Sequence, residues 1–380
     1  MAELSREQRL VLACVRPAPE EAGNLLRDGI EWELLFELAR LHNVLVPVTR
    51  YLANHFPEIS PETMARRFRQ IGTDAVFRYL SMARQLDDVV GRFESEQIPT
   101  LVLKGLPLGV LLHGSPLLRQ TGDIDLMVRP QDVRRAWQIL TGQGLQPMRS
   151  LDDRQQQAVI RYGHAFDFYA PPGKVMVDLH WGVQPHICPL NVRKAWARAQ
   201  DVTVEKRVYR TLSREDYMLF LCYHPVKHGY RDLRAVCDIA ALLRQELDWD
   251  YVQREAEAAG CCRMLWLGVG LAHTLLGASS PLRNQPGIER LLQTARAGLF
   301  GRHRAFRDSP TAWGVRVLDS VRRKAAFLAH KVFVPNEDDF ALWSLPQNLF
   351  VCYYGLRCIR LPWRYARIVK NIVAQRRHPV

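Results

Sequence analysis

The stretch Thr121-Gly-Asp-Ile-Asp-Leu-Met-Val128 places two acidic residues, Asp123 and Asp125, two positions apart at the start of an apolar run. Side chains two positions apart on a strand leave the same face, so these carboxylates are neighbours if the stretch is extended. Like charges side by side are unfavourable unless a cation lies between them. Ile124 points the other way, into the core. The stretch therefore predicts a buried strand that begins at a site for a divalent metal with oxygen ligands.

The segments around this strand predict a small mixed α/β unit. They are a strand at 100–103, a helix at 106–112, a helix that begins at Pro130, and strands at 164–169 and 175–181. The Pro171-Pro-Gly173 turn joins the last two strands. The helix after Pro130 carries apolar residues at the spacing of one helical face: Val133, Ala136, Trp137 and Leu140.

Both flanks of this unit have the three- and four-residue spacing of apolar residues that is typical of helices. Before the unit this spacing extends from about residue 30 to residue 96, and Ser5 with Gln8 resembles a capping box that opens an earlier helix. After Ser213 the chain is almost wholly helical again. The sequence therefore predicts an α+β protein, with a helical N-terminal segment at 1–95, an α/β core at 96–210 and a helical C-terminal domain at 211–380.

The composition is that of a globular chain with a basic surface. Of 380 residues, 48% are hydrophobic and 24% are charged, which excludes a disordered chain. The net charge of +13 favours polyanionic partners such as nucleotides, nucleic acid or an anionic membrane face, without choosing among them. The eight cysteines form no Cys-x-x-Cys pair, which favours a reduced, cytoplasmic chain. We also expect no signal peptide and no membrane span, because neither kind of apolar run is present.

A two-metal site needs a third carboxylate from a neighbouring strand. Asp178 fits this role, since it is flanked by apolar residues on an otherwise buried strand and has little reason to be there without a partner. Asp167, on the preceding strand, is the rival. The alternative for these residues is structural: Asp123 and Asp125 would cap a loop, and Asp178 would form an ordinary salt bridge.

The pair Lys104-Gly105 follows the predicted strand at 100–103 and precedes a helix. A strand, a glycine turn and a helix present backbone N–H groups, a helix N-terminus and an ammonium to an anion, which suits a triphosphate. The pair is not a Walker motif, because no Gly-Lys-Ser/Thr follows a spaced glycine. The order of the segments places this turn beside the carboxylates.

Four motifs in this order resemble those of the uncharacterised bacterial nucleotidyltransferase family, within the DNA polymerase beta-like superfamily. They are Lys104-Gly105, Arg119, Asp123-Ile-Asp-Leu-Met-Val128 and Asp178-Leu-His-Trp181. The stretch from Leu221 through Leu243 is similar to a helical region of that family, so the resemblance covers about residues 100 to 245. His113 departs from the pattern, which has an aromatic residue such as Tyr there.

The resemblance implies a polymerase beta-like fold and transfer of a nucleoside monophosphate from an NTP such as ATP to an acceptor hydroxyl. It implies three catalytic and metal-binding residues, Asp123, Asp125 and Asp178, and three nucleotide-binding residues, Lys104, Gly105 and Arg119. Two Mg²⁺ ions are expected, with Mn²⁺ as the alternative. The acceptor is an unidentified protein, RNA or small molecule.

Four further residues are candidates for the substrate side of the site: His180, His224, Lys227 and His228. His180 follows Asp178 at strand spacing, so it faces the same way and either orients a metal ligand, touches substrate or is structural. The pair at 224 and 228 shares a helical face, but Pro225 replaces the Glu of a zinc-protease helix and no third ligand is evident. We expect this pair to face phosphate or acceptor, or to be structural.

Two other features are expected to be architectural. Asp238 lies in an apolar helix, where a buried charge needs a partner, and we expect Arg231 or Arg234 to supply it. The stretch 357–377 predicts a basic amphipathic helix, which is a solvated helix packed on the domain or a contact with an anionic surface. Two rival functions remain: a catalytically silent nucleotide-sensing or partner-binding module of the same fold, and a basic nucleic-acid or membrane-surface adaptor.

Overall fold

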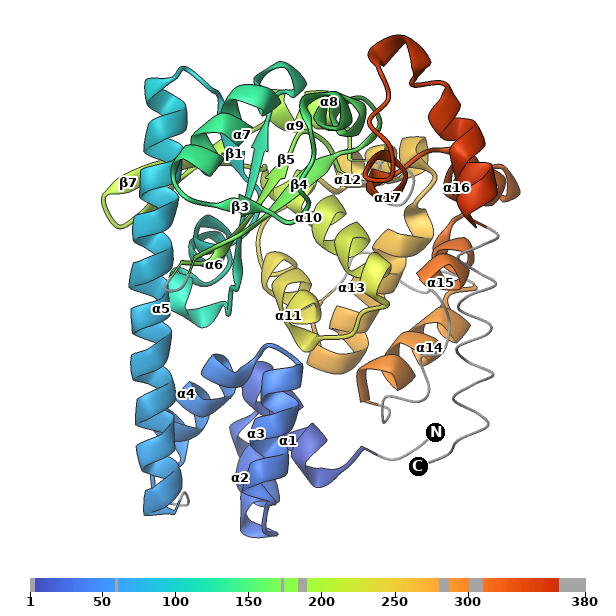
Figure 1. The fold of residues 1–380 in the computed structure, drawn as a ribbon. Coiled ribbons are helices and arrows are strands. Elements are labelled where there is room, and N and C mark those ends of the chain that lie inside the picture. The colour runs from blue at the N-terminus through green and yellow to red at the C-terminus, as the bar shows by residue number, and fades with distance from the viewer. Residues whose placement is uncertain are drawn as a thin grey trace, which may run out of the picture.

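The computed structural model describes residues 4–58, 61–171, 174–183, 190–279, 287–300 and 310–361. Five helices come first: α1 (Arg6–Val15), α2 (Pro19–Arg27), α3 (Trp32–Leu41), α4 (Leu45–His55) and α5 (Glu62–Ser95). The predicted capping box is confirmed, since the Ser5 hydroxyl accepts from Gln8 N and the Gln8 side chain accepts from Ser5 N. In Figure 1, the long α5 runs from these N-terminal helices along the side of the sheet.

The main sheet has five strands in the order β1-β2-β5-β4-β3. They are β1 (Thr100–Val102), β2 (Asp123–Val128), β3 (Gln146–Pro147), β4 (Ala165–Tyr169) and β5 (Met176–His180). β2 and β5 are parallel, whereas the other neighbours are antiparallel. Four of these strands are predicted correctly to within one residue at each end. Part of the predicted Pro171-Pro-Gly173 turn lies outside the described residues.

Short helices follow most strands of this sheet, the last of them leading to the hairpin described below. They are α6 (Leu106–His113), η1 (Pro116–Leu118), η2 (Pro130–Asp132), α7 (Val133–Gly142), α8 (Asp153–Tyr162) and α9 (Val192–Ala197). The apolar face predicted for the helix after Pro130 is confirmed, because all four of its residues are buried. From that face, the Trp137 ring meets Phe166 and Phe168 of β4 with centroids 4.5 and 4.9 Å away.

The two faces of the sheet have different surroundings. Ile124, Leu126 and Val128 of β2 lie in a core cluster with α7 and the C-terminal half of α5. The same cluster contains Phe340 from the C-terminal part of the chain. The alternate residues of β2 leave the opposite face, so Asp125 lies on the side turned away from this cluster. Core packing therefore fixes one face of β2, and the carboxylates lie on the other face.

The remainder of the chain is a hairpin followed by helices. The hairpin strands are β6 (Gln200–Val204) and β7 (Arg207–Thr211). The helices are α10 (Arg214–Tyr223), η3 (His224–His228), α11 (Leu233–Leu242), α12 (Trp249–Ala259), α13 (Cys262–Leu276), α14 (Glu289–Phe300), α15 (Pro310–Val317), α16 (Val321–Phe333), α17 (Glu337–Phe340) and η4 (Gln347–Leu349). The α+β class and the helical C-terminal part are as predicted. No helix in the described ranges combines the length and apolar character that a bilayer crossing requires.

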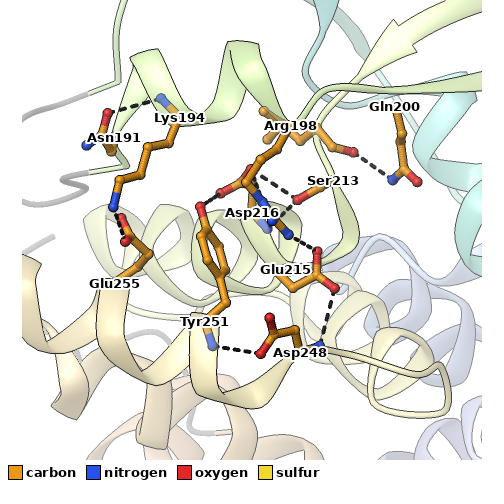
Figure 2. A network of polar contacts seen from close by, with 11 residues as sticks. Asn191, Lys194, Arg198, Gln200, Ser213, Glu215, Asp216, Asp248, Tyr251 and Glu255 are labelled. Carbon is orange, nitrogen blue, oxygen red and sulfur yellow. Dashed lines mark hydrogen bonds and ion pairs between the residues drawn. The ribbon is translucent and has the colours of Figure 1, made fainter.

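A polar network joins the helices α9, α10 and α12 (Figure 2). Asp216 at the start of α10 is 1% exposed, and it accepts hydrogen bonds from Tyr251 Oη and Ser213 Oγ, each 3.0 Å long. Arg198 donates to Glu215 at 2.7 Å and lies over the Tyr251 ring, 4.0 Å from its centroid. Because the carboxylates of this network are satisfied, we interpret it as structural.

Candidate functional site

The register of three neighbouring strands brings three carboxylates into one row. Asp125 of β2 is the partner of Asp178 on β5, and Asp178 is the partner of Asp167 on β4. Residues paired across strands share a face, so the three side chains point to the same side of the sheet. Asp123 is two positions earlier on β2 and shares that face. Asp125 is buried, Asp178 is partly buried and Asp167 is exposed.

Asp125 is held as an anion by a cation from the neighbouring turn. Its Oδ1 lies 2.9 Å from Lys104 Nζ and 3.4 Å from His180 Nε2. Burial raises the pKa of Asp125, but the charge of Lys104 and the contact with His180 outweigh it and hold the pKa far below its ordinary value. The second oxygen, Oδ2, is buried and has no hydrogen-bond partner among the described residues.

Asp178 has the opposite electrostatics. Burial and the charges of Asp125 and Asp167 raise its pKa to about 7. Its Oδ1 is buried and has no hydrogen-bond partner in the described part of the chain. A second positive charge beside these oxygens would therefore stabilise the ionised form of the pair.

The ligand atoms of Asp125, Asp178 and His180 all lie within 4.8 Å of one another. Two carboxylates and an imidazole are a donor set that divalent cations accept, with Mn²⁺ and Zn²⁺ tolerating the nitrogen better than Mg²⁺. The unpartnered oxygens of the two carboxylates supply the vacant lone pairs that such an ion needs. The residues present therefore fit a divalent metal. The predicted ligand Asp123 lies on the same face, at the start of β2.

The Lys104-Gly105 turn lies directly beside the carboxylates. Gly105 has φ 79° and ψ −135°, a conformation that only glycine adopts readily, and it caps α6. Leu103 N donates to the carbonyl oxygen of Asp125 at 2.9 Å, which ties this turn to β2. The sequence predicted that Lys104 faces a phosphate, and the structure adds a contact that was not foreseen, the ion pair with Asp125.

Arg119 is buried and engaged in an ion pair. Its guanidinium donates to both carboxylate oxygens of Asp238 at 3.0 to 3.1 Å, and its Nη1 donates to Thr121 Oγ1 at 3.0 Å. The prediction that Arg231 or Arg234 pairs with Asp238 is therefore wrong. Arg119 supplies the cation for Asp238 although the two residues are more than a hundred positions apart in the sequence. No local sequence pattern reveals such a pairing.

The substrate-side candidates are divided between two parts of the molecule. His180 lies in the row of carboxylates, whereas His224 follows α10 and packs its ring 5.2 Å from that of Phe220. The side chains of Lys227 and His228 lie outside the described residues. η3, which carries them, contacts α10 and α15.

Only the first residues of the predicted basic C-terminal helix are described. Arg357 and Arg360 both donate to the buried carboxylate of Asp339, at 2.7 and 2.5 Å. These two arginines therefore form ion pairs within the fold. Residues 362–377 of this prediction lie outside the described part of the chain.

Comparisons with known proteins place the chain in a family. A model of the family described as uncharacterised nucleotidyltransferase matches residues 28–277. The crystal structure of an antigenic nucleotidyltransferase-like protein from Paracoccidioides brasiliensis is similar at 16% identity and a TM-score of 0.30, over 51% of this chain and 92% of that chain. No curated protein matches. Since the family model covers more than half of the chain, this protein belongs to the uncharacterised nucleotidyltransferase family.

Proposed function

We propose that this protein is a magnesium-dependent nucleotidyltransferase that moves a nucleoside monophosphate from an NTP to an acceptor hydroxyl. The observation that carries the proposal is the cluster of Asp125, Asp178 and His180, whose ligand atoms lie within 4.8 Å and include unpartnered carboxylate oxygens. Membership of the nucleotidyltransferase family supports the same class of reaction. No other group of three ligands with this spacing occurs among the described residues.

Asp123, Asp125 and Asp178 would hold two Mg²⁺ ions, or Mn²⁺ ions, with His180 beside them. Bound divalent ions in such sites stabilise the attacking and leaving oxygens of an in-line displacement at phosphorus. Asp125 is suited to hold a cation at any physiological pH, because its pKa lies far below neutrality. Asp178 is suited to the same role, because the charges of Asp125 and Asp167 beside it favour a cation and its Oδ1 has no hydrogen-bond partner among the described residues.

Three groups of the chain would act on the substrates themselves. Asp178 would accept the proton of the acceptor hydroxyl. At the Gly105 turn, the backbone N–H groups that open α6 would donate to phosphate oxygens. Lys104 precedes Gly105 and would supply positive charge to this site, because its ammonium lies 2.9 Å from Asp125 Oδ1. The same ammonium would neutralise negative charge that grows on the departing pyrophosphate.

Incubation with each α-³²P-labelled NTP, Mg²⁺ and a cell extract tests the proposal. The wild-type protein should transfer label to an acceptor, and Asp125→Asn should not. Asp167→Asn is the matched control, since it removes one carboxylate from the same face of the sheet at an exposed position. Equal labelling by the wild type and Asp125→Asn would contradict the proposed site. Loss of labelling in Asp167→Asn but not in Asp178→Asn would move the third ligand to β4.

A further inference from the structure

A cavity of about 330 Å³ lies away from the carboxylates of Asp125 and Asp178. Its lining residues come from α1, α4, the end of α6, η1 and the segment after it, α11 and the end of α13. We propose that this cavity binds a small molecule that carries a phosphate group. Its volume is at the lower end of the range for small-molecule sites. The inference concerns a separate ligand and does not rest on the proposed transfer reaction.

The charges around the cavity favour an anion. Five arginines line it: Arg16, Arg50, Arg119, Arg234 and Arg244. Asp238 is the only acidic side chain among the described lining residues, and Arg119 pairs with it. Glu21 and Asp232, from outside the lining, pair with Arg16 and Arg234. Arg50 and Arg244 are exposed and have no ion-pair partner among the described residues. Two guanidinium groups are therefore available, and guanidinium is the side chain best suited to phosphate.

Two residues that line the cavity each carry a buried polar atom without a hydrogen-bond partner among the described residues. Tyr51 is 8% exposed, and its hydroxyl has no hydrogen-bond partner in the described part of the protein. The same is true of Gln120 Oε1. A buried polar atom without a partner is unfavourable by about 1–3 kcal/mol, so such atoms in native proteins usually meet a ligand or water. Val44, Pro47 and Leu276 also line the cavity, so an apolar portion of the ligand has a surface to contact.

This cavity and the Gly105 turn lie at opposite ends of α6. Gly105 caps the start of the helix, whereas His113 at its end lines the cavity. Eight helical residues rise about 12 Å, so one phosphate group cannot contact both ends. A hydrogen bond links the cavity lining to the segment before β2. Arg234 donates to the Gln120 carbonyl oxygen at 3.0 Å, and Gln120 lies three residues before Asp123.

Calorimetric titration with inorganic pyrophosphate in the presence of EDTA tests this inference, because chelation removes metal-dependent binding at the carboxylates. The variant is Arg50→Ala/Arg244→Ala, and the matched control is Arg210→Ala/Arg254→Ala, which removes two exposed arginines from β7 and α12. We expect the cavity variant to bind at least about tenfold more weakly than the wild type, from the loss of charge-assisted hydrogen bonds. The control should stay within about twofold, since salt screens the attraction between pyrophosphate and distant charges.

Three results would overturn the inference. One is the absence of saturable binding by the wild type. Another is an equal loss in the control, which would mean that pyrophosphate senses only the net charge. The third is a tenfold loss in Lys104→Met, which would place the pyrophosphate at the Gly105 turn. Arg50→Gln/Arg244→Gln, with a thermal melt, replaces the alanine variant if the latter fails to fold.

Discussion

Asp125 and Asp178 are the same kind of side chain in paired positions, yet their electrostatics differ. Lys104 and His180 contact Asp125, whereas Asp178 faces two other carboxylates. The sequence predicted that Asp123 and Asp125 share a face, because residues two apart on a strand do so. It offered Asp178 and Asp167 only as rivals for a third carboxylate, whereas the strand register places both beside Asp125. It did not predict that Lys104 reaches Asp125, because that contact depends on how the Gly105 turn directs a long side chain.

The raised pKa of Asp178 predicts a pH-dependent stability of the metal-free protein. A carboxyl group with a folded-state pKa of about 7, above its unfolded value, stabilises the fold when protonated. This stabilisation is fully present at acidic pH and is lost as the pH rises towards about 7. We therefore expect Asp178→Asn to unfold at the same temperature as the wild type near pH 4, and at a higher temperature above pH 7. The difference in unfolding free energy should be about 1–3 kcal/mol.

Thermal melts of both proteins in EDTA across this range measure the effect. Asp167→Asn is the control, and it should show a smaller gain because Asp167 is exposed. A constant difference between Asp178→Asn and the wild type at every pH would contradict the assignment.

Lys104→Met should have opposite effects on the two ligands. It removes an ammonium next to the expected triphosphate, so NTP affinity should fall by about ten- to a hundredfold. It also frees the carboxylate oxygen of Asp125 that Lys104 now occupies, so the affinity for Mn²⁺ should rise. Calorimetric titration with a non-hydrolysable NTP and with Mn²⁺ measures both. If NTP affinity is unchanged, Lys104-Gly105 is a plain turn.

The strands β1, β2, β4 and β5 and the helix after Pro130 have strong apolar patterns and were predicted correctly, whereas α8 and the hairpin β6–β7 were missed. The helix α8 has only three buried residues, so its face is too weak to detect, although Asp152 and Gln155 form a capping box that the sequence displays. The hairpin β6–β7 alternates buried and exposed residues. Its turn places Glu205 at a φ of 55°, where the expected residue would be Gly or Asn. The hairpin was therefore missed because its turn lacks the glycine or asparagine that marks such a turn in a sequence.

Gly105→Ala should distort the turn between β1 and α6. Its φ of 79° with a ψ of −135° strains any residue with a Cβ atom, so unfolding free energy should fall by about 1–3 kcal/mol. Gly142→Ala at the end of α7 is the control, because an added Cβ meets no atom within 4 Å and its φ is not positive. Chemical denaturation measures both variants. Equal stabilities of the two would show that the turn tolerates a side chain.

The ion pair between Arg119 and Asp238 joins the segment before β2 to α11. Both side chains are almost fully buried, so Arg119→Met leaves a carboxylate without its cation and should destabilise the protein by about 3–5 kcal/mol. The double variant Arg119→Met/Asp238→Leu removes both charges and should recover part of this loss. Denaturant titration of the two variants measures this recovery of unfolding free energy. Equal losses in both variants would contradict the prediction.

The whole molecule is held together by contacts between segments that are distant in sequence. One core cluster combines α5, the main sheet and Phe340, and the network of Figure 2 joins α9 to α10 and α12. Local patterns in the sequence predicted the elements within each segment. They could not predict these contacts between segments, because nothing in the sequence around Arg119 or Asp238 identifies the other residue as its partner.

Two labelled forms of the same NTP separate nucleotidyl transfer from other phosphate chemistry. The wild-type protein, Mg²⁺ and a cell extract are incubated in parallel with α-³²P-labelled and γ-³²P-labelled NTP, and with Asp125→Asn and Asp178→Asn as variants. The proposed reaction transfers the α label to an acceptor and releases the γ label as pyrophosphate, and both variants abolish it. Transfer of the γ label, or of the α label by both variants, would contradict nucleotidyl transfer at these carboxylates.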